Sequence, residues 1–232
     1  MALIEGLREQ PRDEKTVAFT ILLLLLSGAY LRALCFSNLG DSILKQGFDA
    51  EVTANEDVRV ALFVMVALRT VSQMVWTFYL SNYYLSFGMG FVIAFFNCFF
   101  DTIGILVSLW NKTKMEPIDY FFLVLYVFGI FLERLPEIQR TIWKAKPENK
   151  GKAHMGGAFA VAVHINYTGY FLWRLAFHGF THFLPLLAFN LFFLNDFIKG
   201  DIRTQRERNI KKYGEDFKRY WDSTPKMFPG IY

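Results

Sequence analysis

Polar side chains that could bind a ligand gather in one short stretch of this sequence, between residues 156 and 170. The stretch holds His164, Asn166 and Tyr167 among glycines and small apolar residues. Imidazole, carboxamide and phenol groups can each donate and accept hydrogen bonds. A second set of reactive side chains follows in the tail and comprises Arg203, Arg206, Arg208, Lys211 and Lys212. Together the two sets indicate a cofactor or substrate site at a membrane face, and the basic set is suited to phosphates.

The elements that must position these residues are long and apolar. The chain has 232 residues, of which 53% are hydrophobic and 26 are Phe. The apolar residues form runs, which is typical of a polytopic membrane protein rather than a soluble one. We therefore predict an all-α membrane bundle of about six transmembrane segments with a basic, amphipathic C-terminal helix. The predicted segments are Val17–Phe36, Val58–Leu80, Tyr84–Trp110, Ile118–Leu135, Tyr167–Phe180 and Phe183–Ile198.

The distribution of Lys and Arg predicts the topology of the bundle. If all six segments cross, one side carries 17 Lys and Arg residues and the other carries three. Basic residues favour the cytosolic side, so both termini are expected there. The opposite side holds the acidic loop 37–57. The net charge of +4 therefore belongs mostly to one face, where lipid headgroups are the expected partners. Nucleic-acid binding is not expected, because no aromatic and basic platform lies outside the spans.

The tail of the chain is predicted to be a helix over Asp201–Trp221. Ile210, Tyr213, Phe217 and Tyr220 recur there at helical spacing and form an apolar stripe beneath a basic face. Such a helix docks on a membrane surface or on the mouth of a bundle. We expect one membrane domain over 1–232, with transmembrane helices in 1–135 and the ligand-binding region in 136–232.

Four charged residues lie within or near the ends of the predicted spans. Burying a charge in a bilayer costs a few kcal/mol unless it is paired or reaches water. Arg69 and Asp101, on different helices, are expected to pair, either as a structural ion pair or as part of a polar cavity. Arg174 and Asp196 lie near span ends, where a structural pair or a side chain that reaches the interface is expected.

Cysteine and histidine usage predicts no metal site. Cys35 and Cys98 both lie in apolar runs and are expected to be packing residues rather than a disulfide. His178 and His182 are four residues apart, but no carboxylate lies between them. The spacing is not typical of a zinc site.

Several blocks of the C-terminal region follow one another in a recognisable order. They comprise a helix with a Gln, a basic Pro-x-Asn-x-Gly connector, an Asn-Tyr box, a Trp and a Lys-Tyr-Gly…Pro-x-Ile-Tyr ending. The residues concerned are Gln139, Pro147, Asn149, Gly151, Gly157, His164, Asn166, Tyr167, Gly169, Trp173, Lys212, Tyr213, Gly214, Tyr220, Pro229, Ile231 and Tyr232. In these blocks, residues 128–232 resemble the steroid 5-alpha-reductase superfamily of membrane reductases, in particular its DUF1295-type branch and the sterol reductases.

The resemblance implies a helical membrane enzyme that holds a nicotinamide cofactor, NADPH, at its cytosolic face. Hydride would pass to a double bond of a lipophilic substrate such as a steroid, a sterol or an enoyl lipid. The endoplasmic reticulum is the membrane that the resemblance implies, while a mitochondrial or other organellar membrane stays open. The cofactor-binding residues carried over are Asn166, Tyr167, Gly169, Trp173, Arg203, Arg206, Lys212 and Tyr213.

The chain departs from the family pattern around the Asn-Tyr box. Val163 stands where the family has Arg, Ile165 where it has Pro, and Tyr170 where it has a carboxylate that contributes to the cofactor site. A phenol replaces a carboxylate only in part, because it also donates and carries no charge. The catalytic proton donor is not identified from the sequence. The candidates are Tyr83, Tyr84, Asp101 and Tyr170.

Two other functions stay open. The chain could be a non-catalytic scaffold or accessory subunit that keeps the fold and binds other proteins of a membrane complex. It could also be a relative of the isoprenylcysteine-type membrane methyltransferases, which bind S-adenosylmethionine near a His-x-x-Tyr box. His164 and Tyr167 have that spacing.

Overall fold

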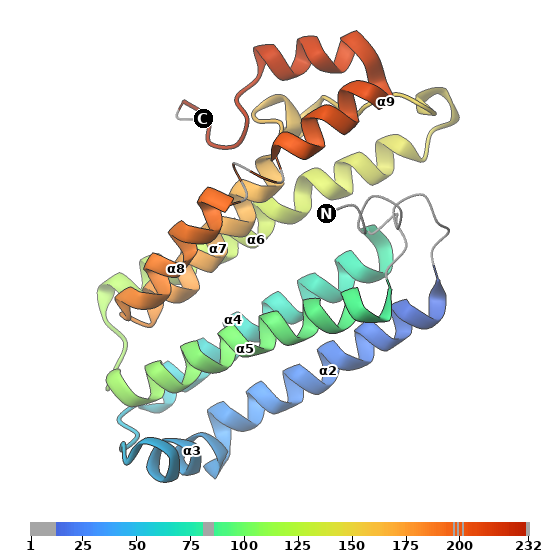
Figure 1. Ribbon diagram of the computed structural model, residues 1–232. Coiled ribbons are helices and arrows are strands. Elements are labelled where there is room, and N and C mark those ends of the chain that lie inside the picture. The colour runs from blue at the N-terminus through green and yellow to red at the C-terminus, as the bar shows by residue number, and fades with distance from the viewer. Residues whose placement is uncertain (1–12, 81–85, 197, 199, 201, 231–232) are drawn as a thin grey trace. The chain divides into compact units, whose positions relative to one another are not determined.

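The computed structural model describes residues 13–80, 86–196, 198, 200 and 202–230 (Figure 1). The described residues contain helices and turns but no strand. The chain divides into two compact units. Unit 1 comprises Met1–Leu123 with Phe180–His182, and unit 2 comprises Val124–Gly179 with Phe183–Tyr232. The all-helical fold expected from the sequence is confirmed for the described part of the chain.

Unit 1 is built on long apolar helices, each begun by a polar cap. Its elements are α2 (Glu14–Phe36), α3 (Asn38–Phe48), α4 (Glu56–Val75), a π-helical turn (Trp76–Leu80) and α5 (Phe87–Asn111). The side chains of the N-cap residues Asp13, Ser37, Asn55 and Ser86 each accept a hydrogen bond from a backbone N–H of the first turn. Such caps satisfy donors that the helix itself leaves unpaired. Helix α2 packs against both α4 and α5.

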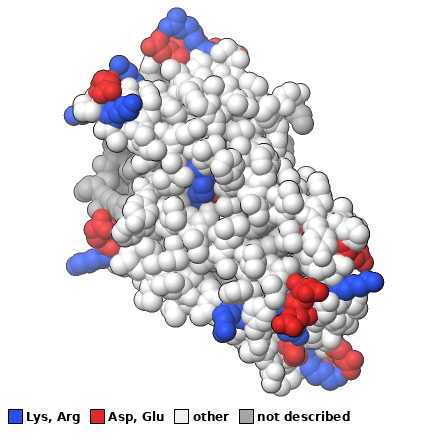
Figure 2. Space-filling model, turned by 180° about the vertical axis from the view of Figure 1, so that it is seen from behind, with Lys and Arg blue, Asp and Glu red and all other residues white. Residues whose placement is uncertain are grey.

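Among the described residues, three helices, all of them in unit 1, are long and apolar enough to cross a membrane. They are Glu14–Phe36 with 23 residues, Glu56–Leu80 with 25 and Phe87–Asn111 with 25. On the face drawn in Figure 2, Lys, Arg, Asp and Glu side chains occur in small groups, and other residues make up most of the surface. The other three segments of the predicted six are also helical. That they cross the membrane stays a prediction.

Unit 2 carries the motifs singled out above. Its elements are most of α6 (Pro117–Lys144), short 3-10 turns at Pro147–Asn149 and Gly157–Ala160, then α7 (Ile165–Phe180), α8 (Leu184–Asp196) and α9 (Ile202–Ser223). Helices α7 and α8 form the predicted hairpin, in which His182 adopts a left-handed backbone conformation with φ 54°. The side chain of Asp196 lies outside the described residues.

Helix boundaries differ from the sequence-based expectation in three places. The acidic loop 37–57 contains α3, which Ser37 caps and Leu44 anchors in the core. Helix α6 does not end at Leu135 but continues past Pro136 for more than two turns. Proline has no backbone N–H to donate, so α6 lacks one backbone hydrogen bond at Pro136 but continues as a helix beyond it. The tail helix α9 is interrupted at Gly214, whose φ of 72° and ψ of −152° only glycine adopts without strain.

The expected pairing of Arg69 with Asp101 is confirmed. Arg69 Nη2 of α4 donates to Asp101 Oδ2 of α5, and both side chains are only 4% exposed. Arg174, expected near an interface, is buried with its guanidinium 4.8 Å from the ring centre of Trp173 and 5.1 Å from that of Tyr170. Its charge therefore meets aromatic faces, which attract cations.

The cysteines are packing residues, and His178 and His182 contact polar groups. Cys35 and Cys98 are free thiols, and Cys35 is fully buried. His178 Nδ1 lies 3.1 Å from the carbonyl oxygen of Leu186, and His182 Nε2 lies 2.9 Å from Asp119 Oδ1. Within the described residues, no group of three or more His, Cys, Asp or Glu side chains is arranged to hold a metal ion.

Candidate functional site

Two glycines bring α6 and α7 into direct backbone contact. A Cβ atom at Gly169 would overlap the backbone nitrogen of Glu133 and would lie 2.7 Å from both Glu133 Cα and the Gly129 carbonyl oxygen. A Cβ atom at Gly129 would likewise overlap the backbone of Trp173. The site residue Gly169, predicted to bind cofactor, is thus a close-packing residue that sets the distance between the two helices.

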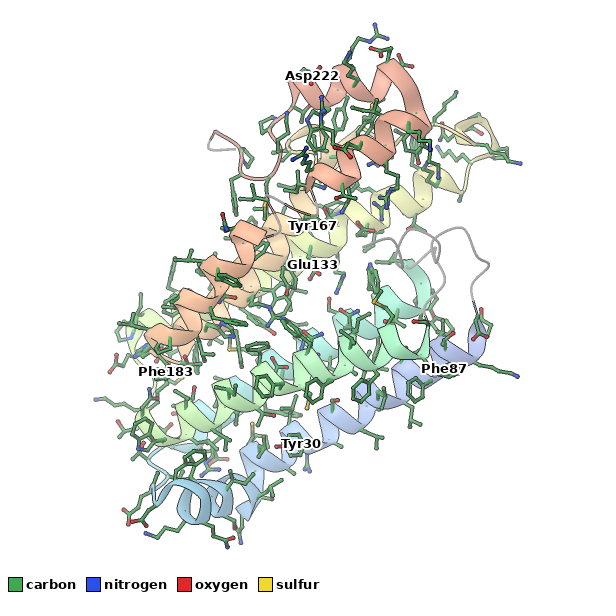
Figure 3. The ribbon with its side chains drawn as sticks, viewed as in Figure 1. Tyr30, Phe87, Glu133, Tyr167, Phe183 and Asp222 are labelled. Carbon is green, nitrogen blue, oxygen red and sulfur yellow. The ribbon has the colours of Figure 1, made fainter. Side chains whose placement is uncertain are left out.

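Two glutamates on α6 hold two of the predicted site residues on α7. Asn166 Nδ2 donates to Glu137 Oε1 over 3.0 Å, and Trp173 Nε1 donates to Glu133 Oε2 over 2.8 Å. The glutamates are one helical turn apart, so they share a face of α6. Figure 3 labels Glu133 and Tyr167, which lie on these neighbouring helices of unit 2. Sequence reasoning missed both glutamates, because it took the polar end of this segment as the boundary of a span.

Glu137 is an ionised, buried carboxylate beyond the end of the predicted span. Its Oε2 accepts from Arg140 Nη2, while its Oε1 accepts from Asn166. Burial raises the pKa of the Glu137 carboxyl, and the charges of Arg140 and Arg134 oppose that rise. The ion pair and the amide donor both stabilise the charged form, which can only accept hydrogen bonds.

Tyr167 and His164 form a stacked pair next to α9. The ring centres lie 5.2 Å apart at 16°, and the Tyr167 hydroxyl accepts a hydrogen bond from Gln205 Nε2. His164 is 5% exposed, and its buried Nε2 atom has no hydrogen-bond partner among the described residues. Burial, with a smaller contribution from the charge of Lys226, lowers the pKa of His164 to about 4. The imidazole is therefore neutral near pH 7, and its Nε2 is a buried polar atom without a hydrogen bond among the described residues.

Several cations surround the aromatic rings of this region. Arg206 and Lys226 lie 5.9 Å and 5.3 Å from the ring centre of Trp221, whose ring also meets that of His164 edge-on at 5.6 Å. Lys226 Nζ donates to the carbonyl oxygens of Trp221 and Thr224. Of the predicted cofactor residues on α9, Arg206 thus joins the His164 group.

The other predicted residues of α9 lie further out. Lys144 Nζ, on α6, donates to the Tyr213 hydroxyl over 3.2 Å, and Lys212 Nζ lies 5.5 Å from the Tyr213 ring centre. Arg203 is 80% exposed and lies 3.6 Å from Glu207. Tyr213 is therefore tied to α6, while Arg203 and Lys212 point to the surface. Gln205, Lys144 and Lys226 were not singled out from the sequence, since only the fold brings them to the box.

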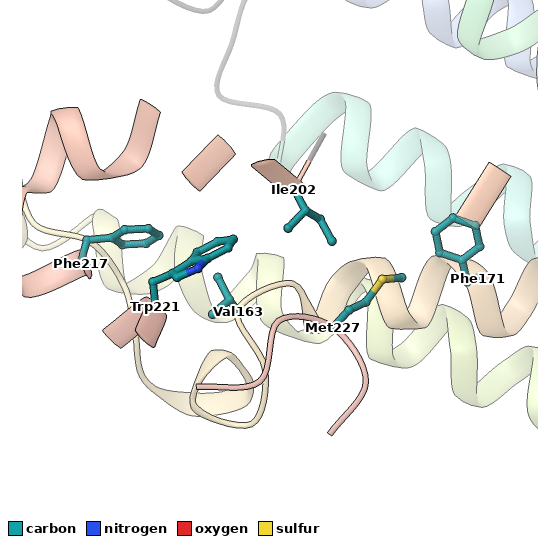
Figure 4. Close-up of a cluster of buried hydrophobic side chains, with 6 residues drawn as sticks. All are labelled: Val163, Phe171, Ile202, Phe217, Trp221 and Met227. Atoms are coloured by element: carbon teal, nitrogen blue, oxygen red, sulfur yellow. The ribbon is translucent and has the colours of Figure 1, made fainter. Parts of the chain in front are cut away.

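A cluster of apolar side chains joins the box to α9. It consists of Val163, Phe171, Ile202, Phe217, Trp221 and Met227 (Figure 4). Ile210, Tyr213 and Tyr220 of the predicted stripe pack against it. The backbone N–H groups of Val163 and His164 donate to the carbonyl oxygens of Pro225 and Lys226 over 2.9 Å and 2.8 Å. The C-terminal segment therefore holds His164 in place through its backbone.

The two departures that flank His164 have a structural explanation. Val163, where the family has Arg, is buried in the cluster of Figure 4. Ile165, where it has Pro, is buried with Phe159 and Ala162 in a second apolar cluster. Both residues contribute apolar packing that holds the box, and neither supplies a polar group to it.

The structure describes two of the four proton-donor candidates, Asp101 and Tyr170, and their surroundings differ. Asp101 is ion-paired with Arg69, and an ionised carboxylate has no proton to give. The Tyr170 ring meets the Trp173 ring edge-on at 5.4 Å and lies next to Arg174. Tyr83 and Tyr84 lie outside the described residues. The geometry argues against Asp101.

Two apolar cavities lie elsewhere in the chain. One of about 300 Å³ in unit 1 is lined by α2 residues such as Val17 and Ile21, with Phe78. The other, of about 60 Å³ in unit 2, lies where Phe171 and Leu175 of α7 face Leu191 of α8. Neither is lined by Asn166 or Tyr167, so the candidate site is defined by its polar groups rather than by either cavity.

Replacing Gly169 with alanine is expected to destabilise unit 2 by about 2–3 kcal/mol, because the new methyl group would overlap backbone atoms that cannot move aside. The matched control is Gly47→Ala in α3, where a Cβ atom meets nothing within 4 Å. That change should be neutral or stabilising by up to about 1 kcal/mol. Thermal unfolding of both variants in detergent measures the difference. Equal midpoints would show that α6 and α7 are not in close contact at Gly169.

Comparison with known proteins places the chain in a family. Residues 66–224 match the family described as "Protein of unknown function (DUF1295)". The chain belongs to this family. The steroid 5-alpha-reductase-like resemblance is thereby confirmed, and the match begins well before residue 128, within α4.

Two curated relatives carry names that point to different chemistries. The chain is 32% identical over 94 residues to the "Probable O-methyltransferase ustE" of Ustilaginoidea virens, which covers 36% of this chain and 33% of that protein. It is 30% identical over 129 residues to the 7-dehydrocholesterol reductase of Xenopus laevis, which covers 46% of this chain and 27% of that protein. The matches span a third or less of each relative.

Proposed function

We propose that this chain is a membrane reductase that binds NADPH on unit 2 and reduces a double bond of a lipophilic substrate. The proposal is supported by the family and by the relation to a sterol reductase. The observation that carries it is His164. Its buried Nε2 lacks a partner, and Arg206 and Lys226 lie around the Trp221 ring that it meets. A buried polar atom without a partner costs free energy that a ligand can recover.

The polar groups of unit 2 fit a nicotinamide dinucleotide. Arg206 and Lys226 would offset the charge of its phosphates, since charge-assisted bonds to cations are the strong ones. Asn166 would hold the carboxamide, and Tyr167 would pack against the ligand, with Arg203 and Lys212 as outer cations. Trp173 and Tyr213 would support these residues from α7 and α9. When bound, the cofactor supplies the hydride for the reduction.

The rest of the proposal concerns the membrane. Residues 1–135 would anchor the chain, and residues 136–232 would carry the cofactor. Six crossings with both termini in the cytosol would place the basic side at the cytosolic face, where NADPH is found. A sterol, steroid or enoyl lipid would enter from the bilayer. The endoplasmic reticulum is the proposed membrane.

Nucleotide binding is expected to stabilise the detergent-solubilised protein against heat. NADPH at a hundredfold excess over its Kd should add about 2.7 kcal/mol, because the ligand binds only the folded state. Asn166→Ala should lose about half of this gain while expression stays normal, because one lost hydrogen bond weakens binding about tenfold. Lys45→Ala is a matched control, since Lys45 pairs with Asp49 on the surface of unit 1. No shift with NADPH or NADH at millimolar concentration would refute the proposal.

Methyl transfer is the second candidate, and one relation favours it. The relative from Ustilaginoidea virens is named as a probable O-methyltransferase, and His164 and Tyr167 are stacked as a pair. Stabilisation by S-adenosylmethionine without stabilisation by NADPH would replace reduction by methyl transfer. No shift with any of these ligands, together with migration in a large complex on a native gel, would indicate a scaffold with membrane protein partners.

A further inference from the structure

We infer that Glu137 is a positioning residue, which fixes the Asn166 amide so that the site takes a ligand group that donates an N–H. The inference rests on the proposed function and extends it to one atom of the site, Asn166 Oδ1. It concerns one hydrogen bond between α6 and α7, from Asn166 Nδ2 to Glu137 Oε1.

The first step is the direction of that bond. Glu137 is 3% exposed, and its other oxygen accepts from Arg140, so the carboxylate is charged and only accepts. An amide next to such an oxygen must present its nitrogen, because an oxygen there would be repelled. The orientation of the Asn166 amide therefore follows from the network around it, which is the proper basis for assigning an amide.

The second step is what this orientation leaves for a ligand. Asn166 is half-buried, and the hydrogen bond recorded for its side chain uses Nδ2. Its Oδ1 is therefore the atom that faces a ligand in this proposal. A carboxamide oxygen only accepts hydrogen bonds. The group that meets it must therefore bring a donor, as the carboxamide of nicotinamide does. An acetyl group in the same place would offer a methyl group that cannot donate, and a carboxylate would set oxygen against oxygen.

The third step is the fixation of Glu137 itself. Arg140 lies one turn further along α6, and its charge together with that of Arg134 stabilises the carboxylate against burial. Glu133, one turn earlier, is engaged separately with Trp173. The two glutamates thus perform separate tasks on one helix face, and Glu133 provides a control for Glu137.

The experiment compares two ligands that differ in one donor. NADP⁺ carries a carboxamide, and its 3-acetylpyridine analogue carries a methyl ketone in the same place. Both Kd values are measured by thermal shift and by calorimetry on the full chain in detergent. The wild-type chain is expected to bind the analogue about tenfold more weakly, as expected for one lost hydrogen bond in a partly buried site.

Variants assign that preference to Glu137. In Glu137→Leu the amide is free to turn, so the preference should fall to about twofold or less. Glu137→Gln has one oxygen for two donors, and that oxygen should stay with the charged Arg140. Its NH2 group then faces Asn166 and reverses the Asn166 amide, so the preference should fall as it does in Glu137→Leu. In Glu133→Gln the tenfold preference should persist. In Asn166→Ala it should disappear, which gives a second readout if Glu137→Leu does not fold.

The outcomes distinguish a failure of the proposed NADPH binding from a failure of the proposed role of Glu137. If the wild-type chain binds neither nucleotide, the proposed function is wrong. If it binds NADP⁺ and the analogue equally well, or if Glu137→Leu keeps the tenfold preference, the role of Glu137 is refuted while NADPH binding stands. A loss of the preference in Glu133→Gln as well would show a general effect of packing rather than positioning by Glu137.

Discussion

Replacing Asp101 alone with leucine is expected to destabilise unit 1 by about 3–5 kcal/mol, because it leaves the charge of Arg69 buried without its partner. The Arg69 guanidinium is already under-satisfied, since its Nε and Nη1 atoms have no hydrogen-bond partner among the described residues. Asp101 supplies the one charged contact of Arg69 that the structure records, between α4 and α5. Unfolding in detergent with increasing denaturant measures the loss.

The double variant Arg69→Met, Asp101→Leu tests the cause. It should recover most of the lost stability, because replacing a buried ion pair with apolar residues of similar volume is often neutral or better. The coupling free energy from the double-mutant cycle should therefore be large. If Asp101→Leu costs less than about 1 kcal/mol, Arg69 reaches water, and the pair lines a polar cavity instead. The cycle thus decides between the two roles that the sequence left open.

The parts of the fold that the sequence predicted are those in which one physical requirement dominates. Long apolar runs must be helical in a bilayer, since every backbone group needs a partner within its own segment. All six predicted segments are helices in the described residues. The pairing of Arg69 with Asp101 was predictable for the same reason, because an unpaired charge is too costly there.

The parts that the sequence did not predict depend on contacts between segments. Glu137 and Glu133 matter because glycines at 129 and 169 bring α7 against α6, and no local pattern reveals that approach. The break in α9 depends on the backbone conformation of Gly214. A Cβ atom there would contact nothing within 4 Å, so no packing contact explains the glycine. Helix α3 was missed because its short apolar side, with Leu44, lies within an acidic stretch.

The candidate site was recognised through its motif and not through its geometry. Asn166, Tyr167 and Arg206 lie in unit 2 with the partners that the fold gives them: Glu137, Gln205 and Trp221. The carboxylate that the family places after the box is absent at Tyr170. Glu133 of α6 instead brings a carboxylate to the neighbouring Trp173.

Unit 2 is expected to lose about 3 kcal/mol of stability as the pH falls from 6.5 to 4, because His164 must take up a proton in a buried site. Burial and the charge of Lys226 lower the pKa of His164 to about 4 in the folded protein, against 6.5 for an ordinary histidine. The unfolded chain therefore binds the proton first. The stabilising effect of neutral His164 is complete above pH 6.5 and is lost through this window, at about 1.4 kcal/mol per pKa unit.

Two variants attribute this acid sensitivity to His164. His164→Gln should flatten the dependence of the thermal midpoint on pH between 6.5 and 4, and Lys226→Met should reduce it in part by removing the second cause of the shift. The burial of Glu137 acts in the opposite sense, since its raised pKa favours folding at lower pH. Parallel curves for the wild type and His164→Gln would show that His164 is not buried.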